Sequence, residues 1–215
     1  STPQAMELIK KAKADGVDVY AETCPHYLFL NEDDLEKFGP FAKCNPPLRP
    51  QELVDGLWKY VLDGTVDYIG SDHSPFLYEE KARGIDNIFK AVAGFPGVDL
   101  RLPLMLDAVA EGKLSLEKVV ELLCVNPARI FGIYPQKGTI QIGADADLAV
   151  FHFGEATVVD KEKNYSHAKD IAIPYDGRTL KVKLTHTILR GRELMKDGVV
   201  DESAKAYGRL VTPVR

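Results

Sequence analysis

Cysteine is scarce in this sequence of 215 residues, which contains Cys24, Cys44 and Cys124 and no CxxC motif. An odd number of widely spaced cysteines argues against a disulfide framework, and the missing CxxC argues against a thiolate zinc site. Long apolar runs are also missing, since stretches such as residues 102–106 and 148–151 are far shorter than the roughly 20 residues of a membrane helix. Because no signal peptide is recognised either, we expect a cytoplasmic protein with no membrane partner.

An excess of basic residues is the third feature that the sequence lacks. It has 27 Lys and Arg against 32 Asp and Glu, a formal net charge of -5, and no sustained basic block. These values give no electrostatic indication of nucleic-acid binding, so no nucleic-acid partner is expected. The 45% hydrophobic content is that of an ordinary globular protein. A small ligand, either neutral or one that tolerates an acidic protein, is the better expectation.

The order of the predicted elements divides the chain near residue 135. Before this point helical and strand patterns alternate, with helices at residues 3–14, 31–39 and 51–63 and strands at 17–22, 41–44 and 66–70. This order predicts an α/β fold of parallel βα units, followed by a mostly β region with a turn at Arg190-Gly191. Because Ser1-Thr2-Pro3 reads as a capped helix start at the first residue, we expect more chain upstream.

Polar side chains follow two of the predicted strands. His26 comes soon after the strand at residues 17–22, and Asp72 and His73 follow the strand at 66–70. In βα architectures catalytic groups gather at the carboxyl ends of strands, where an imidazole and a carboxylate can bind a metal. The same residues can instead be a structural hydrogen-bonding histidine and a turn or cap aspartate. Both interpretations stay open on spacing alone.

Other candidate residues have plainer interpretations. Asn45 opens the stiff segment Asn45-Pro46-Pro47, which could present backbone groups to a planar polar ligand or serve only as a crossover loop. Cys24 and Cys44 are expected to be small buried apolar residues. The remaining histidines are expected in strands or in a solvated loop: His152, His186 and His167.

Six motifs in a fixed order carry a resemblance that covers nearly the whole chain. They are "ETCPHYLFL", "AKCNPPLR", "IGSDHSP", "GFPGVDLRLPL", "NPARIFGIYPQKGTIQIGADADLAVF" and "TLKVKLTHTILRGR". In this order they resemble the carboxyl-terminal half of the cyclic amidohydrolases, which include allantoinase, hydantoinase (dihydropyrimidinase) and dihydroorotase. The first three motifs are most similar to allantoinase, with hydantoinase second and dihydroorotase third.

The resemblance implies a specific fold. Residues 1–135 would form the last three βα units of a (β/α)8 TIM-type barrel that carries part of a metal site. Residues 136–215 would form a small β-sandwich domain and a tail. The implied reaction is metal-dependent hydrolysis of the C–N bond of a small cyclic ureide or imide, most simply of allantoin to allantoate.

The resemblance also implies site residues. Two divalent metals, usually zinc, would activate a hydroxide and polarise the ring carbonyl. His26 would be the metal-binding histidine after the sixth strand, and Asp72 the metal ligand and catalytic proton carrier after the eighth. His73 would lie behind the ligands or face the substrate, while Asn45, Ala93 and Gly94 would meet the substrate through backbone groups.

The sequence departs from the family where most metal ligands would be. It contains no HxH motif, and the carboxylated lysine and the further histidine of the family fall outside it. Because catalytic zinc normally has three protein ligands, His26 and Asp72 alone are not expected to hold a two-metal centre. The chain alone is therefore expected to be inactive. A further alternative is that the chain alone binds no metal. We expect the missing amino-terminal barrel half as a partner and a homo-oligomer in the complete protein. The alternative function is a non-catalytic, dihydropyrimidinase-like assembly protein.

Overall fold

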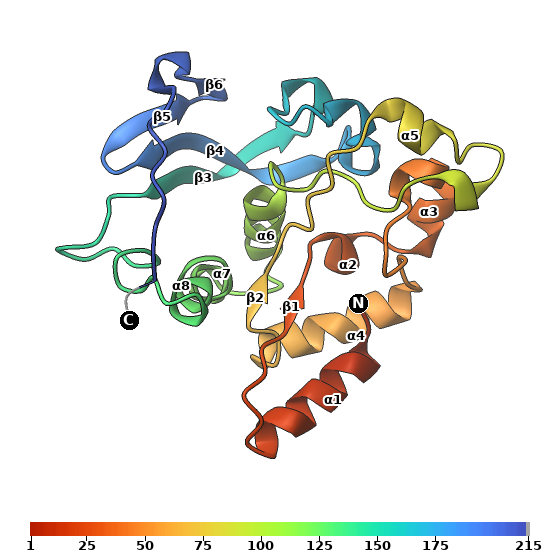
Figure 1. Ribbon diagram of the computed structural model, residues 1–215, viewed down its shortest axis with the longest axis horizontal. Helices are drawn as coiled ribbons and strands as arrows, with labels where there is room; N and C mark the ends of the chain where they lie inside the picture. The colour runs from red at the N-terminus through yellow and green to blue at the C-terminus, as the bar shows by residue number, and fades with distance from the viewer. Residues whose placement is uncertain (214–215) are drawn as a thin grey trace. The chain divides into compact units, whose positions relative to one another are not determined.

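The computed structural model describes residues 1–213, which form two compact units that interleave along the chain (Figure 1). Unit 1 comprises residues 1–105 and 158–178, and unit 2 comprises residues 106–157 and those from 179 onward. The sequence predicted a single division at residue 135, whereas the chain leaves unit 1, returns to it at residue 158 and leaves it again. The assignment of the two parts to a barrel and a β domain stays a prediction.

Unit 1 contains two short strands that pair directly. β1 (Glu22–Thr23) and β2 (Tyr68–Ile69) are parallel, with Glu22 opposite Tyr68 and Thr23 opposite Ile69. The strand expected at residues 41–44 is instead part of a 3-10 helix, η1 (Gly39–Ala42). Pro40 starts this helix, and the Lys43 amide closes its turn onto the Pro40 carbonyl.

This pairing corrects the predicted number of βα units. A third strand between β1 and β2 would separate them, and the described residues of unit 1 contain no such strand. Unit 1 therefore has two parallel strands where three were predicted. If β2 is the eighth strand of a barrel, β1 is the seventh and not the sixth.

Two helices, α1 and α4, pack against each other in unit 1, and both match their predicted positions. α1 (Pro3–Ala14) begins at Thr2, whose side chain accepts a hydrogen bond from the Ala5 amide. α4 (Gln51–Leu62) buries residues at helical spacing, namely Val54, Leu57 and Val61. A Cβ on Gly56 of α4 would lie 2.7 Å from the Pro3 ring, so glycine permits this close approach of α1.

The remaining helices of unit 1 are short. α3 (Glu32–Phe38) starts with a capping box in which the Asn31 side chain accepts from the Asp34 amide and the Asp34 carboxylate accepts from the Asn31 amide. The others are α2 (His26–Phe29), α5 (Tyr78–Ala82), η2 (Ile88–Lys90), η4 (Lys161–Lys163), η5 (Lys169–Ile171) and η6 (Ile173–Tyr175). Helix α6 (Arg101–Ala110) follows the glycine-rich turn Gly94-Phe95-Pro96-Gly97 and continues into unit 2.

Unit 2 contains a helical segment and one sheet. The helical segment runs through α7 (Leu116–Val120), a π-helix η3 (Glu121–Val125) and α8 (Asn126–Ile130), and the Ser115 side chain caps α7. The sheet has the order β3 (Leu148–Val158), β4 (Thr179–Leu189), β5 (Arg192–Lys196) and β6 (Val199–Val200), and η7 (Glu202–Ala204) follows it. The predicted turn at Arg190-Gly191 joins the antiparallel pair β4 and β5. One four-stranded sheet is described, so the second layer of a β-sandwich stays a prediction.

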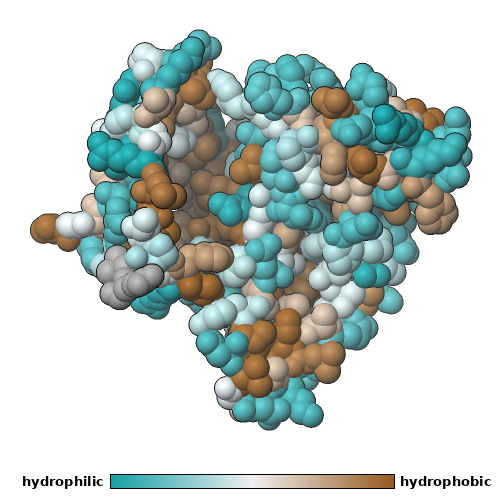
Figure 2. Space-filling view, viewed as in Figure 1, coloured by the Kyte–Doolittle hydropathy of each residue, from teal (hydrophilic) through white to brown (hydrophobic). Residues whose placement is uncertain are grey.

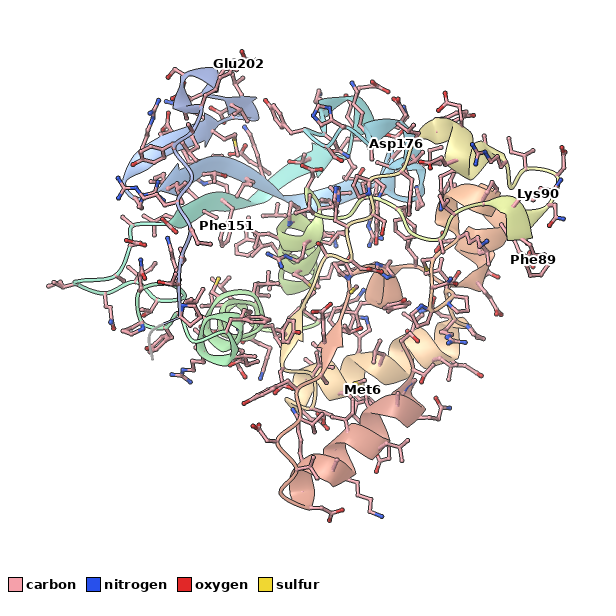
Figure 3. All side chains as sticks on the ribbon, viewed as in Figure 1. Met6, Phe89, Lys90, Phe151, Asp176 and Glu202 are labelled. Atoms are coloured by element: carbon pink, nitrogen blue, oxygen red, sulfur yellow. The ribbon has the colours of Figure 1, made fainter. Side chains whose placement is uncertain are left out.

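Apolar side chains also reach the surface of unit 1. Figure 2 shows a group of apolar residues on the viewed face near α1 and α4. Leu8 of α1 and Leu62 of α4 are both exposed. Phe89 of η2 points outward and is 88% exposed, whereas Met6 of α1 is buried (Figure 3). Across residues 1–213 no helix combines the length and the apolar character that a membrane crossing requires.

Candidate functional site

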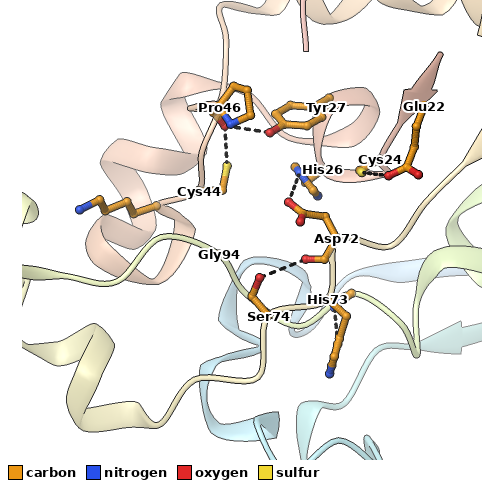
Figure 4. A network of polar contacts seen from close by, with 12 residues as sticks. Glu22, Cys24, His26, Tyr27, Cys44, Pro46, Asp72, His73, Ser74 and Gly94 are labelled. Carbon is orange, nitrogen blue, oxygen red and sulfur yellow. Dashed lines mark hydrogen bonds and ion pairs between the residues drawn. The ribbon is translucent and has the colours of Figure 1, made fainter. Parts of the chain in front are cut away.

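The two residues predicted as metal ligands lie together in unit 1. His26 opens α2, directly beyond β1, and Asp72 lies just beyond β2, so the parallel pairing of the strands brings both to one edge. The Nε2 atom of His26 is 3.7 Å from Oδ2 of Asp72 (Figure 4). Side chains at the carboxyl ends of parallel strands are where α/β enzymes place their catalytic groups.

The imidazole of His26 is held by aromatic rings. It is 4% exposed and packs against Tyr27, with ring centroids 4.1 Å apart, and edge-on against Phe95 at 5.3 Å. Burial lowers the pKa of His26 to about 4, so the ring is neutral at pH 7. Its Nε2 atom is buried and has no hydrogen-bond partner among the described residues. A buried, neutral, unpartnered imidazole nitrogen has the chemistry of a metal ligand or of a hydrogen-bonding group that lacks its partner.

Asp72 differs from His26 in exposure and in backbone conformation. Its side chain is 45% exposed, and its φ of 47° lies in the left-handed region that aspartate tolerates better than most residues. Burial of part of the carboxyl group and the charge of Glu22 both raise the pKa of Asp72. The Ser74 hydroxyl donates to the Asp72 carbonyl at 3.3 Å, as in a turn. Asp72 is thus both a turn residue and a candidate site residue.

Glu22 and Cys24 complete the polar group shown in Figure 4, and sequence reasoning did not single out Glu22. The Cys24 thiol lies 3.8 Å from a carboxylate oxygen of Glu22. Burial raises the pKa of Cys24 to about 12, and burial raises that of Cys44 to about 11. Both cysteines are therefore buried protonated thiols, as expected. The sequence feature that could have indicated Glu22 as a site residue is its place in an alternating strand pattern, two residues before Cys24.

His73 makes hydrogen bonds, whereas the Nε2 atom of His26 has no such partner among the described residues. Its Nδ1 atom accepts hydrogen bonds from the backbone amides of Gly97 at 3.2 Å and Val98 at 3.4 Å. Its Nε2 atom is 3.4 Å from the Ser166 hydroxyl. The two amide donors require an unprotonated Nδ1, so the ring holds the glycine-rich turn and the 158–178 segment in place. A direct substrate contact by His73 stays a prediction.

The segments 43–46 and 92–94, which contain the predicted substrate-binding residues Asn45, Ala93 and Gly94, are neighbours. The Gly94 amide donates to the Lys43 carbonyl at 2.9 Å, which joins Ala93-Gly94 to the segment that precedes Asn45. The Pro46 carbonyl accepts from the Tyr27 hydroxyl at 2.9 Å, so the Asn45-Pro46 bond, which is cis, is anchored next to His26. The structure thus brings both segments toward the residues at the ends of β1 and β2.

The metal-binding capacity of the described residues is incomplete. Over residues 1–213, no group of three or more His, Cys, Asp or Glu side chains has an arrangement that could hold a metal ion. His26 and Asp72 supply one nitrogen and one carboxylate. Two ligands on a tetrahedral zinc with bonds of about 2.0–2.1 Å are about 3.3 Å apart, so the 3.7 Å separation of these atoms fits two positions around one ion.

Comparison with known proteins identifies the family of this α/β chain. The model of the amidohydrolase family matches residues 2–194. The chain belongs to the amidohydrolase family, whose members are generally metal-dependent.

Curated relatives extend over the whole chain. It is 39% identical over 213 residues to an L-hydantoinase from Paenarthrobacter aurescens, a match that covers 99% of this chain and 46% of that protein. It is 41% identical over 217 residues to an allantoinase from Rubrobacter xylanophilus, which covers 100% of this chain and 46% of that protein. The chain thus spans about half the length of the curated relatives it matches.

Solved structures agree with this assignment. A structure titled L-hydantoinase (dihydropyrimidinase) from Arthrobacter aurescens superposes with a TM-score of 0.86 at 39% identity, over 93% of this chain and 44% of that one. A D-hydantoinase structure has the same TM-score at 34% identity over the same shares. The resemblance to the cyclic amidohydrolases inferred from the motifs is confirmed.

Proposed function

We propose that the complete protein hydrolyses the C–N bond of a cyclic amide and that its substrate is allantoin. The support is the family membership together with relatives named allantoinase and L-hydantoinase at about 40% identity. The motifs that favour allantoinase lie at the candidate site, around His26, Asn45 and Asp72. The hydantoinase alternative is supported by the L-hydantoinase relative, and one substrate panel separates the two.

The observation that carries the proposal is the convergence of His26 and Asp72. Asp72 is proposed as a ligand of a divalent metal and as the group that takes a proton from the attacking water and delivers it to the leaving ring nitrogen. A bound divalent ion, zinc in the simplest case, would supply a Lewis acid for the ring carbonyl and would lower the pKa of water. The raised pKa of Asp72, caused by burial and by Glu22, favours this proton transfer.

His26 is proposed as the second ligand from this chain on geometry alone. Its assignment by resemblance depended on β1 being the sixth strand of a barrel, and the direct pairing of β1 with β2 removes that basis. What supports it now is the buried Nε2 atom without a hydrogen-bond partner, 3.7 Å from the Asp72 carboxylate. The other ligands are proposed to come from an amino-terminal barrel half, in an assembly that is a homo-oligomer.

The test uses the complete protein, assayed with allantoin, hydantoin, dihydrouracil and dihydroorotate. Wild type should turn over allantoin fastest, and Asp72→Asn should lose at least ~10³-fold in kcat, because both its ligand charge and its proton acceptor are lost. Absence of turnover on all four rings would refute the proposed function. If hydantoin were turned over fastest, the hydantoinase alternative would replace the proposal of allantoin as the substrate.

Metal content separates the roles of the two residues. Asp72→Asn and His26→Ala should each lower the zinc bound per chain, with Asn31→Ala, a substitution at the half-buried N-cap of α3, as the control that keeps it. Full metal content in His26→Ala beside a loss in Asp72→Asn would remove His26 from the ligand set while leaving Asp72 in it.

A further inference from the structure

Lys81 is a cationic side chain with no exposed surface. It lies in α5 and is 0% exposed. Its Nζ atom donates to three backbone carbonyl oxygens, those of Lys43 at 2.9 Å, Val92 at 3.3 Å and Gly94 at 2.8 Å. An ammonium group has three N–H donors, so this one is fully satisfied by the backbone.

The Lys43 ammonium group also donates to backbone carbonyl oxygens. Its Nζ atom donates to the carbonyl oxygens of Ile88 at 2.8 Å and Ala91 at 2.6 Å. Lys43 and Lys81 are called the lysine pair below. Together they hold the segment that leads into Asn45 against the segment 88–94 that contains Gly94.

Lys81 lacks the usual compensation for a buried charge. No ion pair joins either ammonium group of the lysine pair, that of Lys81 or that of half-buried Lys43, to a carboxylate within residues 1–213, so backbone carbonyl dipoles stabilise the fully buried charge of Lys81. Burial lowers the pKa of Lys81 to about 8, and the nearby charge of Lys43 acts in the same direction. An apolar side chain of similar length would fill the same space without the cost of desolvating an ammonium group. What the ammonium adds is directional attachment to three carbonyls on two separate segments.

We propose that Lys81 is a positioning residue that fixes the backbone of Asn45 and of Ala93-Gly94 in the geometry that receives the cyclic substrate. This inference rests on the proposed function, because these backbone groups are the proposed substrate contacts. A planar ring with amide donors and acceptors needs such groups at fixed positions. A displacement of about 1 Å in a positioning element costs on the order of 10²-fold in rate.

The first experiment compares Lys81→Met with Lys13→Met in the complete protein. Lys13 is the control, since its Nζ atom also donates to a backbone carbonyl, that of Thr65, pairs in addition with Asp67, and lies outside the two substrate segments. Lys81→Met should raise KM about tenfold, which corresponds to ~1.4 kcal/mol of substrate binding, with kcat reduced less and metal content unchanged. Lys13→Met should leave KM unchanged. An unchanged KM in Lys81→Met, or an equal rise in Lys13→Met, would overturn the proposal.

The second experiment measures hydrogen exchange and does not depend on activity. Peptides that cover residues 43–46 and 88–96 should exchange about tenfold faster in Lys81→Met than in wild type, while the α1 peptide is unchanged. Exchange that stays at the wild-type rate overturns the inference even if the enzyme is active. If wild type hydrolyses no cyclic amide, the proposed function fails and the exchange result alone decides whether Lys81 holds these segments.

Chemical rescue provides the third readout. Lys81→Ala removes the ammonium and leaves space for it, so added propylammonium should lower KM again, whereas sodium at the same ionic strength should not. Equal values in the two salts would contradict a role of the ammonium. Lys81→Gln, which keeps one amide donor, replaces Lys81→Met under the same criteria if the latter does not fold.

Discussion

Gly94→Ala should destabilise unit 1 more than an alanine at other glycines of this unit, because two penalties coincide at this position. Gly94 has a φ of +119°, where L residues with a Cβ are strained. A Cβ built there would also lie 2.4 Å from the Ser74 hydroxyl oxygen and 2.5 Å from the Ser74 Cβ. The first penalty comes from the backbone and the second from packing.

The two penalties can be sized separately. Forcing a non-glycine residue into a sparsely populated backbone region costs about 1–3 kcal/mol. Forcing extra atoms into a packed site costs another ~1–3 kcal/mol. Gly94→Ala should therefore lower the free energy of unfolding by about 2–6 kcal/mol. Gly64 separates the two terms, because it has a φ of +84° while its added Cβ would meet no described atom within 4 Å.

The assay is urea unfolding followed by the fluorescence of Trp58, the only tryptophan of the chain, which lies in unit 1 with both glycines. Gly64→Ala should cost only the backbone term, so the difference between the two variants should be about 1–3 kcal/mol. Adding Ser74→Gly should recover that difference in the Gly94→Ala background and not in the Gly64→Ala background. Equal losses in Gly64→Ala and Gly94→Ala, with no rescue by Ser74→Gly, would refute the reasoning.

Two further predictions concern Lys81 and a helix cap. Because burial lowers the pKa of Lys81 to about 8 and an unfolded lysine keeps its proton to about pH 10.4, the unfolded chain binds the extra proton between these values. The contribution of Lys81 to the free energy of unfolding should therefore rise with pH over this range. Between about pH 7.5 and pH 10 the urea midpoint should rise less in Lys81→Met than in wild type. An equal rise in the two proteins would contradict this assignment. Asn31→Ala removes the acceptor of the Asp33 and Asp34 amides and should cost about 1 kcal/mol, which Asn31→Ser should largely restore; an unchanged urea midpoint would show that the cap contributes nothing.

Three helices of unit 1, α1, α3 and α4, could be predicted because their signals are local. Thr2 and Asn31 cap the helices that follow them, and the apolar spacing of Val54, Leu57 and Val61 gives the buried face of α4. Such signals act within one or two turns of chain, so neighbouring residues suffice to specify them. The six ordered motifs carried the family in the same way, and the family model that matches residues 2–194 confirmed it.

The number of strands could not be predicted from such signals. The segment at residues 41–44 has a short strand-like pattern, and the sequence gives no sign that a 3-10 turn from Pro40 takes its place. Only the pairing of β1 with β2 excludes a strand between them, and that pairing joins residues 46 positions apart, such as Glu22 and Tyr68. One wrong strand then shifted the strand number assigned to His26.

The sequence by itself determined the family, the approximate bounds of α1, α3 and α4, and the positions of His26 and Asp72 beyond two strands, because each follows from residue types close together in the chain. Only the tertiary structure decided that the His26 imidazole is buried and lies 3.7 Å from Asp72. It also decided that His73 holds backbone amides and that Lys81, in a polar stretch with no sign of burial, binds three carbonyls. The reason is physical: burial and the direction of a side chain depend on segments that come together only in the folded chain.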